Sequence, residues 1–188
     1  MNSIAPYEVH ELVVRASESR VEITRILGRN DTDDELRTAA DSLRQPRRLQ
    51  DPDFGTLVLD RRVNWFTATI PWQGQTVELN VEPDEQGDFT SAFETARALF
   101  HARADWTGRF EDRAVVSLLT VKNESWLEDG DVPVTEREIR SRIRLASITV
   151  SESGQFECDF EDGDLFWGHA IVVRGTLSDG ATRGTIMG

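Results

Sequence analysis

The sequence has few of the features that mark secreted, membrane-bound and metal-thiolate proteins. Its single cysteine, Cys158, excludes an internal disulfide and any CxxC zinc or redox motif. No hydrophobic stretch approaches the roughly 20 apolar residues of a membrane span, and the N-terminal segment has acidic residues where a signal peptide carries positive charge. We therefore expect a cytoplasmic protein with no membrane partner and no cofactor.

Catalytic motifs are absent as well. The chain has no GxSxG nucleophile elbow, no phosphate-binding GxxxxGK[ST] and no GxGxxG dinucleotide pattern. His10 and Glu11 begin like the helix of a zinc protease, but the second histidine of that motif is missing. Because these motifs are absent, we expect a binding protein rather than an enzyme, although a catalytic site can also assemble from scattered residues.

Acidic residues are the charges in excess. The 188 residues include 34 Asp and Glu against 21 Lys and Arg, which gives a formal net charge of −13. Residues 1–50 hold 9 acids and 8 bases, so the imbalance belongs to the remainder of the chain. Affinity for nucleic acid begins with a basic surface, so we expect no nucleic-acid partner. An acidic surface favours a basic protein partner, and it equally serves solubility.

Residues 1–50 have a helical pattern. Apolar residues recur at spacings of three and four from about Tyr7 to Leu27, which predicts an amphipathic helix. Thr32 and Glu35 form a capping-box pattern at the start of a second, shorter helix. We therefore predict an N-terminal helical hairpin over residues 1–50.

Residues 51–188 predict a separate α+β domain. Apolar residues alternate with polar ones in three short stretches between residues 56 and 81, as in an antiparallel meander. Helical spacing follows over residues 91–121, and the last fifty residues return to strands. We expect a mainly antiparallel sheet of about six to seven strands with two helices packed on one face.

The densest group of unusual side chains lies in residues 161–169, which read EDGDLFWGH. Asp162, Asp164 and His169 could hold a divalent metal or form an acid–base pair. The alternative is a polar turn in which the histidine is satisfied by a neighbouring carboxylate. Either way, at least two of the three residues from Leu165 to Trp167 should be buried, because exposing all three is costly.

Five tryptophans are many for this length, and they fall into two groups. Trp72 and Trp106 fit apolar faces of a strand and a helix, so we expect both in the core. Trp65 and Trp126 lie outside such faces and could anchor a partner. For Trp126, closure of the core explains its position equally well.

Several short segments together resemble a bacterial family catalogued as domain of unknown function 2262. They are Phe54-Gly55-Thr56-Leu57 with Trp65, Leu118-Leu119, Lys122-Asn123 with Trp126-Leu127, Leu145 with Ser147-Ile148, and Asp162 to His169. The most specific is Asp164-Leu165-Phe166-Trp167-Gly168-His169, and the resemblance covers roughly residues 51–188. It implies a compact bacterial intracellular domain and supplies no catalytic residues. Small acidic domains of this kind suggest, by analogy, immunity proteins of toxin systems.

These observations favour a non-enzymatic, acidic protein-interaction domain, with an immunity or inhibitor role as its sharper form. The partner would then be a basic protein. The residues that we expect to contact a partner or ligand are Asp162, Asp164, Trp167, His169, Trp126 and Trp65. The alternative is a small metal-dependent enzyme or ligand-binding domain that uses Asp162, Asp164 and His169.

Overall fold

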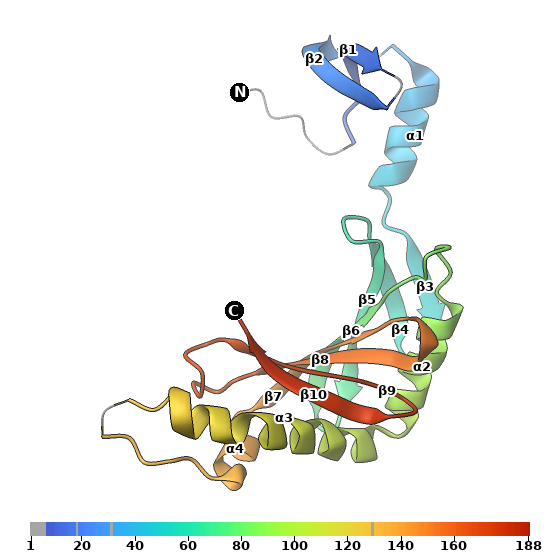
Figure 1. The fold of residues 1–188 in the computed structure, drawn as a ribbon. Coiled ribbons are helices and arrows are strands. Elements are labelled where there is room, and N and C mark those ends of the chain that lie inside the picture. Colours follow the sequence, from blue (N-terminus) through green and yellow to red (C-terminus); the bar gives the residue numbers. More distant parts are fainter. Residues whose placement is uncertain (1–6, 18, 31, 129) are drawn as a thin grey trace. The chain divides into compact units, whose positions relative to one another are not determined.

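A computed structural model describes residues 7–17, 19–30, 32–128 and 130–188. The chain divides into two compact units, residues 1–47 and residues 48–188, which are described separately (Figure 1). Among the described residues, no helix combines the length and the apolar character needed to cross a bilayer.

The first unit is a two-stranded hairpin followed by one helix, so the predicted N-terminal helical hairpin is wrong. Strands β1 (His10–Ser17) and β2 (Arg20–Arg29) pair antiparallel, and helix α1 (Asp34–Arg44) follows. The segment is rich in valine and isoleucine, which favour the pleated surface of a strand over a helix.

Two bulges in β2 interrupt the alternating pattern that would have indicated a strand. The pairing of β1 with β2 shifts between Glu11 and Leu12 and again between Val13 and Val14. Each shift places an extra residue in β2, so Ile23 and Ile26 face the same side although they are three residues apart. A spacing of three is also one of the spacings of a helix, although the prediction rested on Val9, Leu12, Val13, Ala16, Ile23 and Leu27 and not on Ile26.

Helix α1 confirms part of the prediction for its segment. Its N-cap is Asp33, whose carboxylate accepts a hydrogen bond from the amide of Leu36 at 2.9 Å. Thr32 does not cap the helix, because its hydroxyl donates to the side chain of Asn30.

The second unit is α+β, as predicted, and is built on an eight-stranded sheet in the order β10-β9-β8-β7-β6-β5-β4-β3. Its strands are β3 (Arg48–Asp51), β4 (Gly55–Asp60), β5 (Trp65–Trp72), β6 (Gln75–Val81), β7 (Arg144–Val150), β8 (Gln155–Glu161), β9 (Ala170–Thr176) and β10 (Gly180–Met187). Its helices are α2 (Thr90–His101), α3 (Arg103–Ser125) and α4 (Glu136–Arg142), and a 3-10 turn lies at Glu152–Gly154.

The sheet consists of two meanders joined in its middle. β3 to β6 and β7 to β10 are each antiparallel, whereas β6 and β7 are parallel neighbours. A parallel pair needs a long crossover, and the three helices between β6 and β7 supply it. The prediction therefore fell short in the number of strands and missed the mixed character of the sheet.

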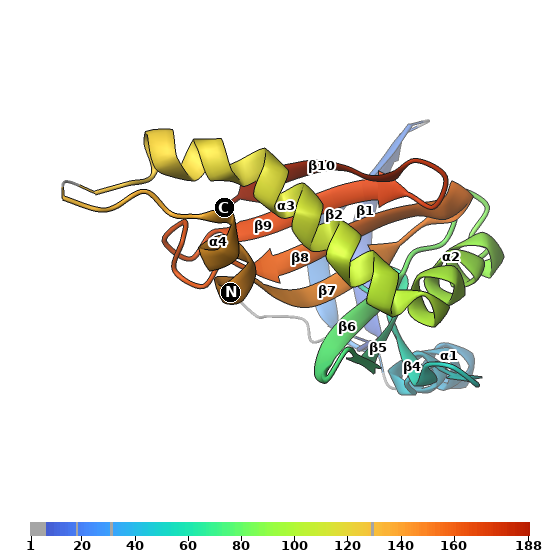
Figure 2. The same ribbon diagram turned by 90° about the horizontal axis from the view of Figure 1, so that it is seen from below.

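Helices α2 and α3 pack against one face of the sheet, where the main core lies (Figure 2). The rings of Trp106, Phe110 and Phe156 meet there, with centroids 5.2–5.6 Å apart. Trp72 and Trp106 are buried, as predicted. Cys158 is fully buried on the same face, and desolvation raises the pKa of its thiol well above the usual value.

Candidate functional site

The loop between β8 and β9 is organised by a buried carboxylate. One oxygen of Asp162 accepts a hydrogen bond from the amide of Phe166 at 2.6 Å and from that of Gly168 at 3.1 Å. The other oxygen accepts from the amide of Asp164 at 3.2 Å. Three backbone donors use the carboxylate of Asp162 to fix the loop, which leaves it poorly placed to ligate a metal ion.

A glycine attaches this loop to helix α4. Gly163 has a φ of 57°, and a Cβ built on it would lie 2.5 Å from the carbonyl oxygen of Arg142. The guanidinium of Arg142 in turn donates through Nε to the carbonyl of Gly163 at 2.8 Å. Only glycine allows this approach, so the loop is tied to the end of α4 by its backbone.

The three large apolar residues of the loop divide as predicted. Leu165 and Phe166 are fully buried, whereas Trp167 is 62% exposed. The φ of Trp167 is 56°, a left-handed conformation that bulky residues rarely adopt. The hydrogen bonds to Asp162 on either side of Trp167 hold it in this conformation.

Trp126 lies at the centre of an aromatic cluster that includes this loop. Its ring meets that of Phe166 edge to face, with centroids 5.4 Å apart. It also lies 4.8 Å from the ring of Trp167 and 5.3 Å from that of His169. Three of the expected contact residues, Trp126, Trp167 and His169, are thus brought together, and Trp126 joins the buried side of the loop to its exposed side.

The only lysine of the chain positions Trp126, a role that the sequence did not reveal. Lys122 is buried near the end of α3, and its Nζ donates to the carbonyl of Trp126 at 2.7 Å. The neighbouring Asn123 exchanges two hydrogen bonds with the backbone of Val134, at 2.8 and 3.0 Å. Both residues therefore anchor the irregular segment that follows α3.

A hollow of about 340 Å³ lies beside Trp167, and we call it the acidic hollow. Its lining includes four carboxylates (Glu128, Asp131, Glu138 and Asp164) and two cations (Lys122 and Arg142). Both cations already donate to backbone carbonyls. The hollow therefore has a surplus of negative charge.

The four carboxylates of the acidic hollow differ in whether they accept hydrogen bonds from the protein. Glu138 forms a capping box with Thr135, whose amide and hydroxyl lower the pKa of the Glu138 carboxyl. Asp131 accepts a hydrogen bond from the amide of Glu128 at 3.0 Å. The carboxylates of Glu128 and Asp164 make no hydrogen bond or ion pair with another described residue. Nothing in the described ranges occupies these two carboxylates, so they are the ones that a ligand could bind.

The three residues considered as metal ligands do not converge. Asp162 is engaged with backbone amides, Asp164 lines the acidic hollow, and His169 contacts the ring of Trp126. Among the described residues, no group of three or more His, Cys, Asp and Glu side chains could hold a metal ion. Within the same residues, no carboxylate forms an ion pair with His169.

Trp65 belongs elsewhere in the second unit. It begins strand β5 and lines a separate cavity with Glu82, Glu157 and Arg174. The structure therefore does not bring Trp65 together with the cluster around Trp126.

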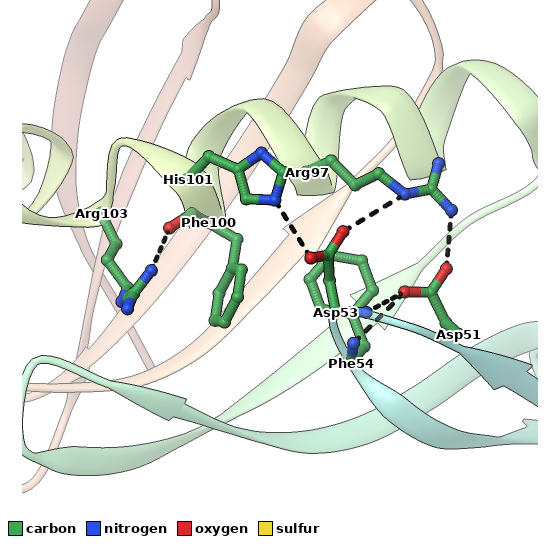
Figure 3. A network of polar contacts seen from close by, with 7 residues as sticks. All are labelled: Asp51, Asp53, Phe54, Arg97, Phe100, His101 and Arg103. Carbon is green, nitrogen blue, oxygen red and sulfur yellow. Dashed lines mark hydrogen bonds and ion pairs between the residues drawn. The ribbon is translucent and has the colours of Figure 1, made fainter.

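A polar network that the sequence did not predict connects β3 with helix α2 (Figure 3). The guanidinium of Arg97 lies 2.6 Å from the carboxylate of Asp51 and 3.7 Å from that of Asp53. His101 reaches the other oxygen of Asp53 at 3.1 Å. The signal that could have revealed this network is Arg97 itself, a cation at an apolar position of the helix pattern.

Within this network, Asp51 experiences opposing effects. Burial raises the pKa of its carboxyl, but hydrogen bonds from the amides of Asp53 and Phe54 and from Arg97 lower it further than burial raises it. The ring of Phe54 meets that of Phe100 edge to face, with centroids 5.4 Å apart. The network therefore fastens the start of the sheet to α2 and is explained by structure alone.

Comparison with protein families gives one match. Residues 51–186 match the model of the family described as "Uncharacterized protein conserved in bacteria (DUF2262)". The curated proteins contain no match to this chain, and neither do the solved structures. The family match confirms the resemblance drawn from the short segments, and its description states no activity.

Proposed function

The chain belongs to the DUF2262 family of bacterial proteins, and we propose that it is a non-enzymatic protein that binds a basic segment of a partner protein at the acidic hollow. A toxin inhibited by such binding is the sharper form of this proposal, by analogy with small acidic immunity proteins.

The observation that carries the proposal is the exposed indole of Trp167. Leaving such a side chain in water forgoes roughly 1.5–3 kcal/mol of burial. A left-handed φ adds strain on the order of 1 kcal/mol. The hydrogen bonds to Asp162 fix the backbone at Trp167, but they do not require a large, mostly exposed apolar side chain there. A partner that covers Trp167 gives a reason for it, since buried aromatic anchors dominate many protein interfaces.

The surroundings of Trp167 favour a cationic partner. Glu128 and Asp164 line the acidic hollow next to it and are not paired with another described residue. A guanidinium group can stack on an indole face and bind a carboxylate at the same time. The net charge of −13 would further accelerate association with a basic protein.

A defined arginine peptide, Gly-Arg-Gly-Arg-Gly, tests the proposal by calorimetric titration at low salt. We expect Trp167→Ala and Asp164→Asn each to weaken binding by about tenfold, because each removes one contact to a desolvated cation. Glu124→Gln is the matched control: it makes the same change in charge at an exposed position of α3 outside the acidic hollow. Equal losses in the control and in Asp164→Asn would show non-specific attraction and contradict the proposal.

The alternative, a metal site formed by Asp162, Asp164 and His169, has no comparable support. Asp162 is committed to three amides, and the other two side chains lie in different surroundings.

A further inference from the structure

The face of the sheet opposite to α2 and α3 carries a row of polar residues. Direct cross-strand pairing connects Thr67 with Asn80, Asn80 with Thr149, Thr149 with Glu157, and Glu157 with Arg174. Side chains on one strand alternate between the two faces. Since the neighbours of these residues in sequence form the core under the helices, the row faces the other side.

At the end of this row lies a cavity of about 230 Å³, which we call the sheet-face cavity. Its lining comes from neighbouring strands: Trp65 of β5, Glu82 directly after β6, Thr149 of β7, Glu157 of β8 and Arg174 of β9. The amide of Glu82 donates to the carbonyl of Val150 at 2.9 Å, so the backbone beneath this residue is held by the sheet. The cavity is therefore built on regular structure and not on a loose loop.

The charges of the sheet-face cavity do not cancel. Arg174 forms an ion pair through Nε with Glu157, and its Nη2 also reaches the sulfur of Met187 at 3.6 Å. Glu82 has no hydrogen bond or ion pair to its carboxylate from any other described residue. Burial, followed by the charge of Glu157, raises the pKa of Glu82. One negative charge is thus left uncompensated in a partly desolvated place.

Four neutral polar groups around the sheet-face cavity also have no side-chain partner within the part of the chain that the structure describes. They are the indole N–H of Trp65, the hydroxyls of Thr149 and Ser151, and the side-chain amide of Gln155. None of them makes a side-chain hydrogen bond with another described residue. These groups are open to solvent and line one space, so they are free to hydrogen-bond a ligand that enters it.

From these observations we infer that the sheet-face cavity binds a primary ammonium group carried on a short aliphatic stem. An ammonium ion has three donors and no acceptor, which matches the carboxylate of Glu82 and the hydroxyls of Thr149 and Ser151. The ring of Trp65 favours a cation, and the two carboxylates disfavour an anion. The volume suits a ligand the size of a lysine side chain. This site is distinct from the acidic hollow, so either can fail without the other.

The ammonium group can come from a free amine or from a lysine of a partner, and two probes distinguish these sources. Calorimetric titration with n-butylammonium chloride represents the free amine, and Nα-acetyl-lysine methylamide represents a lysine within a chain. Tighter binding of the first favours a small-molecule ligand, and tighter binding of the second favours a partner protein. We expect n-butanol and sodium butyrate, which lack the cation, to bind at least tenfold more weakly.

Substitution of Glu82 gives the decisive test. Glu82→Gln keeps the size of the side chain and removes its charge, and we expect it to weaken binding of both amines by about tenfold. Glu85→Gln is the matched control, because Glu85 is exposed in the next turn and does not line the sheet-face cavity. Thr149→Val should weaken binding by a smaller factor without removing the carboxylate. Equal binding of butanol and butylammonium, or equal losses from Glu85→Gln and Glu82→Gln, would overturn the proposal.

Discussion

The two units of this chain differ most in where their apolar side chains lie. In the first unit, Ala40 is the only buried apolar residue among those the structure describes there. In the second unit, large apolar residues from both meanders and from three helices form one continuous core. The same kinds of side chain are therefore used in opposite ways, and stability must be distributed very unevenly along the chain.

The hairpin of the first unit shows this contrast in detail. Its bulged register places three apolar cross-strand pairs in a row: Leu12 with Ile26, Val14 with Ile23, and Ala16 with Val21. The large members of this row are all exposed, which is unusual for a strand face. A two-stranded hairpin and an 11-residue helix are each marginal in isolation. The first unit therefore has a regular row of paired apolar side chains but no buried core of its own.

The strongest test of this contrast separates the two units. We expect residues 48–188 to unfold cooperatively in urea when expressed alone, because their core is complete within that range. Residues 1–47 should show no cooperative transition by circular dichroism, because they bury too little apolar surface. A molten fragment 48–188, with secondary structure but no sharp transition, would mean that the first unit completes its core.

A matched pair of substitutions tests the contrast at single residues. Ile148 is 1% exposed in β7, whereas Ile23 is 58% exposed in β2. We expect Ile148→Ala to lower the free energy of unfolding of the full chain by about 2–5 kcal/mol. The same change at Ile23 should cost no more than about 0.5 kcal/mol, as at ordinary surface positions.

The readout for this pair can be assigned to one unit. All five tryptophans lie in the second unit, so the urea midpoint followed by tryptophan fluorescence reports on that unit alone. Circular dichroism reports on both. A loss of several kcal/mol for Ile23→Ala would show that the apolar row of the hairpin is covered in solution.

The same contrast explains how far the sequence predicted the fold. Two strands that face the core have a regular apolar period: β5 alternates strictly, and the apolar residues Val77, Leu79 and Val81 of β6 lie two residues apart. In the hairpin, bulges interrupted the period of two in β2, and adjacent apolar residues such as Val13 and Val14 obscured it in β1. The parallel pair of β6 and β7 could not be seen either, because strand direction depends on how the crossover closes.

Within the candidate site, residue types were easier to predict than roles. The composition of residues 161–169 indicated an unusual segment, and burial of Leu165 and Phe166 followed from their size. That Asp162 would bind amides instead of a metal depended on the left-handed turns of the loop, which sequence patterns do not specify. The role of Lys122 depended on a carbonyl four residues later, which only the end of α3 places within reach.

One carboxylate in each unit offers a further test, with a smaller expected effect on stability. Asp162 accepts three amides in the second unit, and Asp33 caps α1 in the first by accepting one. We expect Asp162→Ala to cost about 2–3 kcal/mol, because it leaves buried amides unpaired. Asp33→Ala should cost α1 about 1 kcal/mol.

The two substitutions should also differ in the probe that detects them. Asp162→Ala should move the transition seen by tryptophan fluorescence, whereas Asp33→Ala should leave that transition unchanged and alter only circular dichroism. The control is Asp164→Asn, which removes a negative charge from the same loop and keeps a residue type that tolerates the φ of 62° at this position. The carboxylate of Asp164 accepts no hydrogen bond from another described residue. If Asp164→Asn were as costly as Asp162→Ala, the amides would not be the cause.

The smallest expected effect concerns His169, for which the sequence suggested a carboxylate partner. The described residues place no carboxylate in an ion pair with it, and its ring instead meets Trp126 edge to face at 5.3 Å. His169→Ala then leaves no buried acceptor unpaired and removes one aromatic contact, so we expect a loss of about 0.5–1.5 kcal/mol in the urea midpoint analysis. His101→Ala, which breaks an exposed ion pair with Asp53, is a matched control expected to cost at most about 1 kcal/mol.

A loss above about 2 kcal/mol for His169→Ala alone would restore the buried hydrogen bond as its role. Unchanged stability with loss of zinc binding in a calorimetric titration would instead restore the metal site.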